Sequence, residues 1–362
     1  MQPQTRRLHE ESWWHGRDVL VHEVIAEVAA AFPQCAAVEV VTDAQLRTSS
    51  HLFTSAGQGP EVFTYAALHS MAMRLANVLR RSIAGHPEDE AKVVVLVDEG
   101  VGLVVCELAV LMAGGAFVPI DPNWPPQRLA FIVRDCDARV LLLPRVAAHS
   151  LPPKLAEAGL QLGTEHLALV WEDALQEAAE PAARAEAEPL PPPRGHTRRA
   201  DRCSHVVYTS GTSGQPKGVV CEHAGLLAYM HAKASPPAHC LLSHPLAEPD
   251  ESQAGAGRIG GVAAACGGRV ERVEGRQRPS RVLITAASSW DPSLGDIFSA
   301  LAAGAVVCLA PRGAVQVSLG DVVHAARPTH ICSTPALWAT VEGGPEAADG
   351  VAETRAEKRR KL

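Results

Sequence analysis

The chain has 362 residues and a formal net charge of −7, with 47% hydrophobic and 20% charged residues. This composition is typical of a folded globular protein and argues against a disordered chain or a general nucleic-acid-binding protein. No apolar run approaches the roughly 18 residues of a membrane-spanning helix. None of the nine cysteines belongs to a Cys-x-x-Cys pair, so zinc and redox motifs are absent. The polar start, without an apolar leader, predicts a cytoplasmic protein with reduced thiols.

The N-terminal part of the chain alternates helix-like and strand-like patterns. Apolar residues recur at helical spacing in some stretches, whereas KVVVLV at 92–97 is a continuous apolar run that suits a strand buried on both faces. This alternation predicts parallel α/β layering. After a disordered start over 1–18, the expected elements are a helix over 19–31, a strand over 36–41, a loop over 42–60, an amphipathic helix capped by Thr64, a turn over 86–90, a strand over 92–97, a helix over 103–113, a strand over 116–120, a helix over 125–134 and a strand over 139–143.

The second half is interrupted twice. Residues 151–204 are rich in Ala, Glu and Pro, most strongly over about 176–200, and are expected to form a linker. Residues 233–280 show no periodicity and look like an insertion, either a true surface loop or a translated intron. The other expected elements are a helix over 224–232, a strand over 282–285, a helix over 294–303 ended by Gly304, a strand over 306–310, a strand and a helix within 327–341, and a disordered basic tail over 342–362.

The most informative stretch spans residues 206–220 and reads VVYTSGTSGQPKGVV. Glycines let backbone N–H groups approach a ligand closely, while hydroxyls and a lysine add donors and positive charge. The stretch therefore predicts a polyphosphate site, and the alternative is a flexible Gly/Ser surface loop. Its spacing does not match the Walker motif Gly-x4-Gly-Lys-Ser/Thr. The predicted phosphate-binding residues are Thr209, Ser210, Gly211, Thr212, Ser213, Gly214 and Lys217.

The run Tyr-Thr-Ser-Gly-Thr-Ser-Gly-Gln-Pro-Lys-Gly at 208–218 resembles the phosphate-binding signature of the adenylate-forming superfamily. A second match is the segment 111–142, in which Asp121 and Arg128 fit the family pattern; Asp121 is interpreted as a turn or capping residue. The resemblance implies the large N-terminal domain of these enzymes, with helix-flanked and largely parallel sheets. It also implies ATP-dependent activation of a carboxylic acid as an acyl-adenylate, with Mg²⁺ as cofactor and pyrophosphate as the leaving group.

Trp-Asp-Pro-Ser at 290–293 resembles the Phe-Asp-x-Ser segment of amino-acid adenylation domains. A carboxylate beside a plain acid substrate would be a liability, but it would pair with the α-ammonium group of an amino acid. The resemblance therefore assigns Asp291 to substrate binding, and the alternative is a turn residue before Pro292. The same match implies that Pro292 and Gly295, and more weakly Ser333, line the side-chain pocket.

The resemblance covers about residues 19–341, without the stretch 233–280. The later family segments that contact adenine and ribose, and the lysine near the C-terminus, have no counterpart here, so the small C-terminal domain is expected to be absent and the chain truncated. No catalytic residue and no metal ligand is predicted. An incomplete large domain is also expected to expose sheet edges and to be poorly soluble.

Three functions remain open at this point. The first is a partial amino-acid adenylation domain of a nonribosomal-peptide-synthetase-like protein. The second is an inactive remnant that binds a nucleotide or a partner, and the third is an acyl-CoA synthetase fragment, which Asp291 argues against. The expected partners are a carboxylic or amino acid and a carrier domain, whose phosphopantetheine arm would belong to a separate or missing domain. His223, at the start of a helix, is interpreted as structural rather than as a general base.

Overall fold

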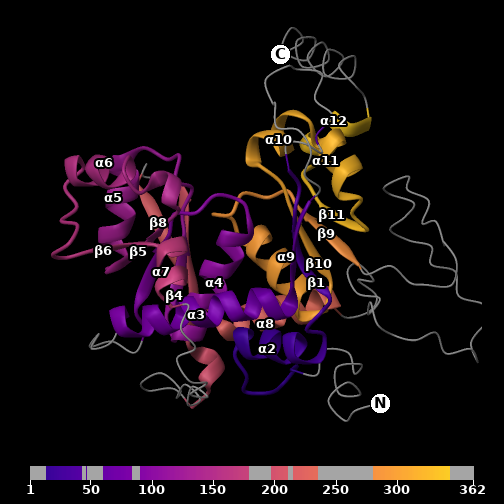
Figure 1. Ribbon diagram of the computed structural model, residues 1–362, viewed down its shortest axis with the longest axis horizontal. Coiled ribbons are helices and arrows are strands. Elements are labelled where there is room, and N and C mark those ends of the chain that lie inside the picture. Colours follow the sequence, from indigo (N-terminus) through magenta and orange to yellow (C-terminus); the bar gives the residue numbers. More distant parts are fainter. Residues whose placement is uncertain are drawn as a thin grey trace, which may run out of the picture.

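The computed structural model describes residues 14–42, 46, 60–83, 90–178, 197–210, 215–234 and 280–342. These residues form two β-sheets that are flanked and joined by helices (Figure 1). The first has five strands in the order β11-β9-β10-β1-β2, and the second has six in the order β6-β5-β3-β4-β7-β8. All strand pairs are parallel except β1 with β2 and β7 with β8. The predicted α/β class with largely parallel sheets is confirmed.

The six-stranded sheet is built mostly from consecutive segments. Val93, Val94 and Val95 are fully buried, because a strand of a parallel sheet has helices on both faces. The hairpin of β7 and β8 closes one edge of the sheet, with β8 outermost. The strands are β3 (Lys92–Val95), β4 (Ala116–Pro119), β5 (Val140–Leu143), β6 (Leu167–Val170), β7 (Cys203–Ser210) and β8 (Pro216–Glu222).

The five-stranded sheet joins segments that lie far apart in the chain. Val38 of β1 is paired with Val307 of β10, and β9 lies between β10 and β11. Glu39 is nearly buried and forms an ion pair with Arg281 at 2.7 Å, which links β1 to the first residue of β9. The strands are β1 (Ala36–Val40), β2 (Glu61–Thr64), β9 (Arg281–Ile284), β10 (Val306–Leu309) and β11 (His330–Cys332).

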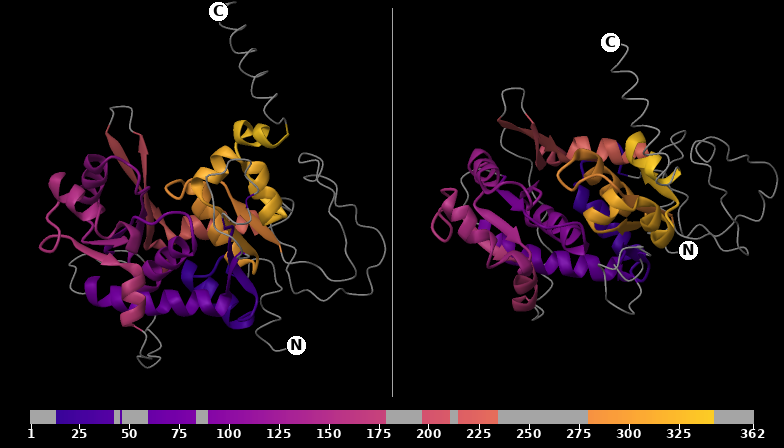
Figure 2. Two further views of the ribbon diagram at one scale, coloured as in Figure 1. Left: turned by 45° about the horizontal axis from the view of Figure 1, so that its top comes forward. Right: turned by 90° about the horizontal axis from the view of Figure 1, so that it is seen from above.

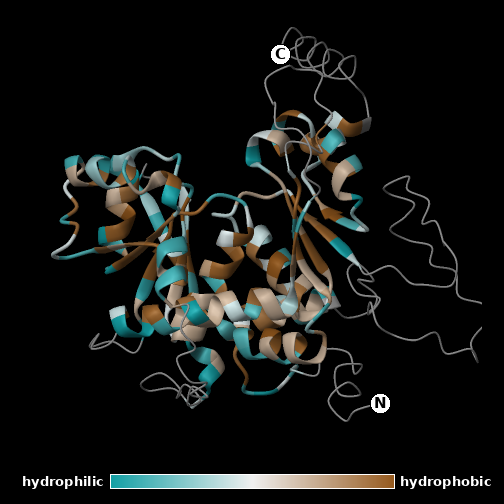
Figure 3. Cartoon of the chain, viewed as in Figure 1, coloured by the Kyte–Doolittle hydropathy of each residue, from teal (hydrophilic) through white to brown (hydrophobic). Residues whose placement is uncertain are grey.

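One hydrophobic core connects the two sheets. It contains α4, nearly all of whose residues are buried, together with parts of α2, α3, α8 and α9. The long helix α3 runs beneath both sheets (Figure 2), and Figure 3 shows hydrophobic residues concentrated on the strands and the enclosed helices. The helices are α2 (Val21–Ala31), α3 (Tyr65–Ile83), α4 (Val101–Ala113), α5 (Pro126–Asp135), α6 (Leu151–Glu157), α7 (Trp171–Glu177), α8 (His223–Ala234), α9 (Asp291–Ala302), α10 (Arg312–Val317), α11 (Leu319–Ala326) and α12 (Pro335–Glu342), with 3₁₀ turns η1 (Arg145–Ala147) and η2 (Arg199–Asp201).

Two expectations about the chain's organisation need correction. The prediction of a linker over 151–204 is wrong for most of the described residues in that range. Helices α6 and α7 and strand β6 lie there, and β6 pairs in parallel with β5. Its Pro-rich centre, 179–196, lies outside the described residues. The disordered start over 1–18 does not hold for 14–18, because Trp14 is buried and Asp18 accepts a hydrogen bond from the backbone N–H of Ala200 at 2.9 Å.

Other boundaries are close to those expected. Thr64 accepts a hydrogen bond from the N–H of Ala67 at 3.2 Å and caps α3 as predicted. The insertion-like stretch begins later than 233, since α8 continues to Ala234; residues 235–279 and the tail over 343–362 lie outside the described residues. The sheet edge at β8 is exposed as expected, with Val220 64% accessible. None of the described helices combines the length and apolar character needed to cross a bilayer.

Candidate functional site

The predicted phosphate-binding residues lie at the tip of the β7–β8 hairpin. Thr209 is paired with Lys217 across the two strands, and the Thr209 hydroxyl donates to the carbonyl of Lys217 at 3.4 Å. Thr209, Ser210 and Lys217 are all exposed. The four residues between them, Gly211, Thr212, Ser213 and Gly214, lie outside the described residues. The described part of the hairpin thus presents two hydroxyls and one ammonium group at the same end.

This hairpin tip lies at the carboxyl edge of the six-stranded sheet. β7 is parallel to β4, and β4 to β3, so the ends of all three strands meet at one edge. Open α/β sheets bind ligands outside the carboxyl ends of their strands. Asp98 and Asp121 follow β3 and β4 at this edge. Burial, together with the negative charge of Asp121, raises the pKa of Asp98 above its ordinary value.

The hairpin is anchored to α5 close to its tip. The Tyr208 hydroxyl donates to Oδ2 of Asp135 at 2.7 Å. Gly218 lies opposite Tyr208, and a Cβ at this position would lie 3.0 Å from the Tyr208 ring. Glycine therefore lets the ring lie across the hairpin towards Asp135. Sequence reasoning missed this anchor, although Asp135 belongs to the second matching segment.

The predicted substrate residues lie mainly on α9. Asp291 is its first residue and Pro292 its second, and both are exposed. Proline is well tolerated at the start of a helix, so the alternative of a turn at Asp291-Pro292 is replaced by a helix N-terminus. Gly295 lies on the same face as Asp291, one turn later, and is buried. Ser333 follows β11, is half-buried, and donates its hydroxyl to the carbonyl of Thr334 at 3.3 Å, without a described contact to α9.

The segment that leads to Asp291 is held from both sheets. Glu99, which follows β3, accepts a hydrogen bond from the N–H of Ser288 at 3.4 Å. Arg312, which follows β10, donates to the carbonyl of Thr285 at 2.8 Å. Burial raises the pKa of Glu99 above its ordinary value. The segment before α9 thus connects the carboxyl edges of the two sheets.

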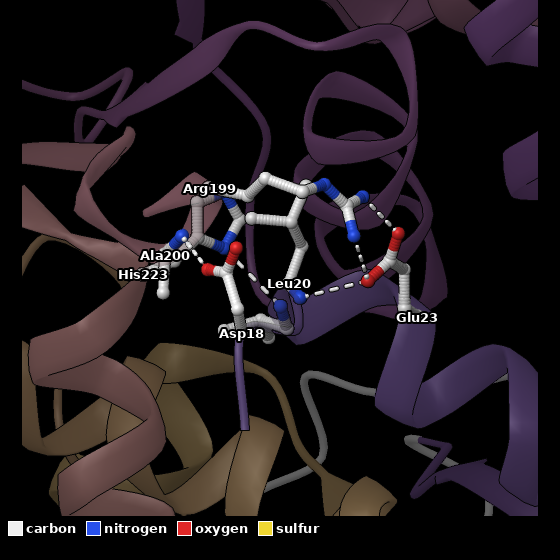
Figure 4. A network of polar contacts seen from close by, with 7 residues as sticks. Asp18, Leu20, Glu23, Arg199, Ala200 and His223 are labelled. Atoms are coloured by element: carbon white, nitrogen blue, oxygen red, sulfur yellow. Dashed lines mark hydrogen bonds and ion pairs between the residues drawn. The ribbon is translucent and has the colours of Figure 1, made fainter. Parts of the chain in front are cut away.

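A polar network lies where the N-terminal segment meets the hairpin (Figure 4). Glu23 forms an ion pair with Arg199 and accepts a hydrogen bond from the N–H of Leu20 at 2.9 Å. Nδ1 of His223 accepts a hydrogen bond from the N–H of Val21 at 3.2 Å. His223 is buried, and burial holds its pKa well below the ordinary value, so it is a neutral acceptor that joins α2 to α8. The structural interpretation of His223 is confirmed.

The described residues contain no group of three or more His, Cys, Asp or Glu side chains arranged to hold a metal ion. Mg²⁺ in nucleotide sites is held by substrate phosphates and water, with one or two carboxylates. A site of that kind needs fewer protein ligands than such a group.

Known proteins match this chain over most of its length. A family model described as "AMP-binding enzyme" matches residues 40–248. The nonribosomal peptide synthetase agiA of Aspergillus flavus is 27% identical over 323 residues, which are 88% of this chain and 3% of that protein. Tyrocidine synthase 3 of Brevibacillus parabrevis is 36% identical over 165 residues, 46% of this chain and 2% of that protein. The chain thus spans a small fraction of these curated relatives.

Solved structures share the fold. The N-terminal subdomain of Klebsiella oxytoca NpsA, in complex with 3-hydroxybenzoyl-AMSN, has a TM-score of 0.59 at 18% identity. The match covers 91% of this chain and 64% of the NpsA chain. VinN, in complex with 3-methylaspartate, has a TM-score of 0.58 at 18% identity, with 88% of this chain and 67% of VinN covered.

Proposed function

The chain belongs to the AMP-binding enzyme family, whose model matches residues 40–248. We propose that it carries the triphosphate and acid sites of an amino-acid adenylation domain. The observation that carries the proposal is the placement of Asp291. This exposed carboxylate begins α9, and the segment before it is bonded to Glu99 from the edge where the phosphate hairpin lies. The proposed triphosphate site and the proposed acid site, which adenylation must combine, would therefore lie at the neighbouring carboxyl edges of the two sheets.

In this reaction a carboxylate oxygen of the acid attacks the α-phosphorus of ATP. A new P–O bond forms, the bond to the β-phosphate oxygen breaks, and pyrophosphate leaves with the electron pair. Catalysis of such transfer depends mainly on positioning and on neutralising charge. Lys217 and the hydroxyls of Thr209 and Ser210 would hold the β- and γ-phosphates. The hydrogen bond between Tyr208 and Asp135 holds the backbone beside these groups to α5.

Asp291 selects an amino acid as the acid. Its carboxylate would pair with the α-ammonium group, which turns an electrostatic penalty into a binding contact. Pro292 and Gly295 follow on the same helix and would line the side-chain pocket, and Ser333 would approach it from the end of β11. VinN, which shares the fold, has been solved with 3-methylaspartate and with L-aspartate, which supports an amino acid as the ligand.

The acceptor of the activated acid would be the phosphopantetheine thiol of a carrier domain. The peptide synthetases among the relatives support this assignment. The described cysteines are free thiols, which supports a reducing compartment such as the cytoplasm.

Exchange of labelled pyrophosphate into ATP, measured with each of the twenty amino acids, tests the proposal. We expect exchange with at least one amino acid, and its loss in Lys217→Ala. Lys154→Ala, which removes an exposed lysine from α6, is the matched control and should retain exchange. No exchange by the wild-type chain, together with unchanged ATP binding in Lys217→Ala, would favour the inactive remnant. Exchange with fatty or aryl acids but not with amino acids would favour the acyl-CoA synthetase fragment.

A further inference from the structure

Helix α8 packs against α9 at Gly295. The Tyr229 ring from α8 occupies the space that a side chain at position 295 would fill: a Cβ there would lie 2.2 Å from Cε1 and 2.6 Å from Cζ of Tyr229. No real Cβ tolerates such distances, so any residue other than glycine would displace the ring. The surface at this point of α9 is therefore provided by α8.

The ring lies on the side of Gly295 that faces Asp291. Cα–Cβ bonds of an α-helix tilt towards its N-terminus, so the space beyond a Cβ at 295 points towards the preceding turn. Asp291 begins that turn, four residues earlier and on the same face, which corresponds to a rise of about 6 Å along the axis. A molecule whose ammonium group pairs with Asp291 would meet the Tyr229 ring within about one helical turn.

Lys233 links the ring to a buried carboxylate. Lys233, one turn after Tyr229 on α8, forms an ion pair with Asp296, whose side chain is only 4% exposed. The Lys233 ammonium also lies 5.1 Å from the centre of the Tyr229 ring, within the range of a cation–π contact. Moving the ring would therefore cost its contact with Lys233, which the ion pair with Asp296 holds in place.

We propose that Tyr229 is a specificity-determining residue, whose ring forms the wall of the amino-acid pocket at Gly295 and restricts the substrate to a small side chain. This inference rests on the function proposed above. Tyr229 is 37% exposed, so part of its ring is accessible to a ligand. Because the ring already fills the space beyond Gly295, we expect a ligand held at Asp291 to be accepted with a side chain of the size of alanine or serine. A side chain of the size of phenylalanine would have to displace the ring from its contact with Lys233.

Binding of non-hydrolysable acyl-adenylate analogues tests the proposal without turnover. The probes are the sulfamoyl-adenosine analogues of alanine and phenylalanine, titrated by calorimetry against the wild-type chain, Tyr229→Ala and Tyr229→Phe. We expect the wild type to bind the alanine analogue at least ~10-fold more tightly, because a hydrophobic pocket discriminates about 10- to 200-fold per methylene. Tyr229→Ala should reduce this ratio at least ~10-fold by gaining affinity for the phenylalanine analogue. Tyr229→Phe, which keeps the ring, should preserve the ratio.

The outcomes separate the two proposals. If the wild type binds neither analogue, the proposed function fails and the inference fails with it. If both bind and Tyr229→Ala leaves their ratio unchanged, the inference alone fails. Thermal unfolding provides an independent check of the contact: Gly295→Ala should lower the melting temperature in the wild type but much less in Tyr229→Ala. An equal loss in both backgrounds would show that the ring does not occupy this space and would overturn the inference.

Discussion

The β7–β8 hairpin, which is the proposed phosphate site, and helix α9, which is the proposed acid site, are assembled in different ways. In the hairpin, Thr209 and Lys217 are eight residues apart and paired in adjacent strands, so a short stretch of sequence defines the site. Around α9, the contacts join distant segments: Tyr229 lies over Gly295, and Glu99 holds Ser288. The proposed triphosphate site therefore depends on local chemistry, whereas the proposed choice of the acid depends on long-range packing. Substitutions in the core should affect the second more than the first.

The largest expected effect is a loss of stability at acidic pH, which should act on the buried histidines next to the hairpin. Burial lowers the pKa of His205 to about 4 and that of His223 well below its ordinary value. The unfolded chain takes up these protons first, near pH 6.5, so the stability that the neutral histidines confer is complete above this pH and is lost as the pH falls towards 4. We expect a loss of about 2 kcal/mol per histidine between pH 6.5 and 5.

Urea unfolding at pH 7 and pH 5 measures this loss. His205→Gln cannot take up a proton, so it should reduce the difference between the two pH values by the contribution of one histidine, about 2 kcal/mol; His22, whose pKa burial also lowers to about 4, adds to what remains. A free energy of unfolding that does not change between pH 7 and pH 5 would contradict the burial of both histidines.

Truncation of Phe298 should cause the next largest loss of stability. Because Phe298 lies on α9, the proposed acid site should be affected before the hairpin. Phe298 is fully buried on α9 and stacks on Phe117 of β4, with ring centres 6.0 Å apart. Phe298→Ala removes this contact and leaves a cavity, which typically costs 3–5 kcal/mol, so we expect about 4 kcal/mol. Val317→Ala is the control, because Val317 is 86% exposed. Equal unfolding free energies for the two variants would show that α9 is not packed as described.

The ion pair between Glu39 and Arg281 should contribute less to the free energy of unfolding than Phe298, but its contribution should still be measurable. Glu39→Ala leaves a partly buried guanidinium without its carboxylate, although Arg281 keeps its bond to the carbonyl of Ala326 at 2.7 Å. We expect a loss of about 2–3 kcal/mol, slightly below the range for fully buried pairs. Asp173→Ala removes the exposed pair with Arg145 and should cost at most about 1 kcal/mol in urea unfolding. The reverse order would contradict the account of β1 and β9.

The smallest expected effect concerns the anchor of the hairpin. Tyr208→Phe removes the hydroxyl that donates to Asp135, which should cost about 1 kcal/mol of stability. The hairpin would then be less well positioned, so the affinity for ATP should fall while the choice between amino acids stays the same. Calorimetric titration with ATP and with the alanine and phenylalanine analogues distinguishes these effects. A changed preference between amino acids would show that the hairpin and the acid site are not separate in the way described.

The sequence predicted well what local patterns encode. The alternation of strands and helices and the Thr64 cap depend on neighbouring residues, so periodicity and capping preferences were sufficient. It also predicted the helix that contains Gly295, but it began that helix at residue 294 and left Asp291 outside it; α9 begins three residues earlier, because Pro292 suits a first turn.

What the sequence missed depends on tertiary contacts or on misleading composition. Strand β6 lies in an Ala- and Glu-rich region, and it is stabilised as a strand by pairing with β5 rather than by its own pattern. Tyr229 carries no motif; only the packing of α8 on α9 brings its ring to Gly295. Asp135 likewise becomes an anchor only when β7 lies beside α5.

The central claim, that the chain pairs triphosphate contacts with an amino-acid site, is tested most directly at Asp291. The measurement is ATP–pyrophosphate exchange with an amino acid that supports it and with the matching acid that lacks the amino group, in the wild type and in Asp291→Asn. The account predicts that the wild type prefers the amino acid and that Asp291→Asn loses this preference by at least ~10-fold, as expected for a lost charge-assisted bond. An equal loss for both acids, or none for either, would contradict it.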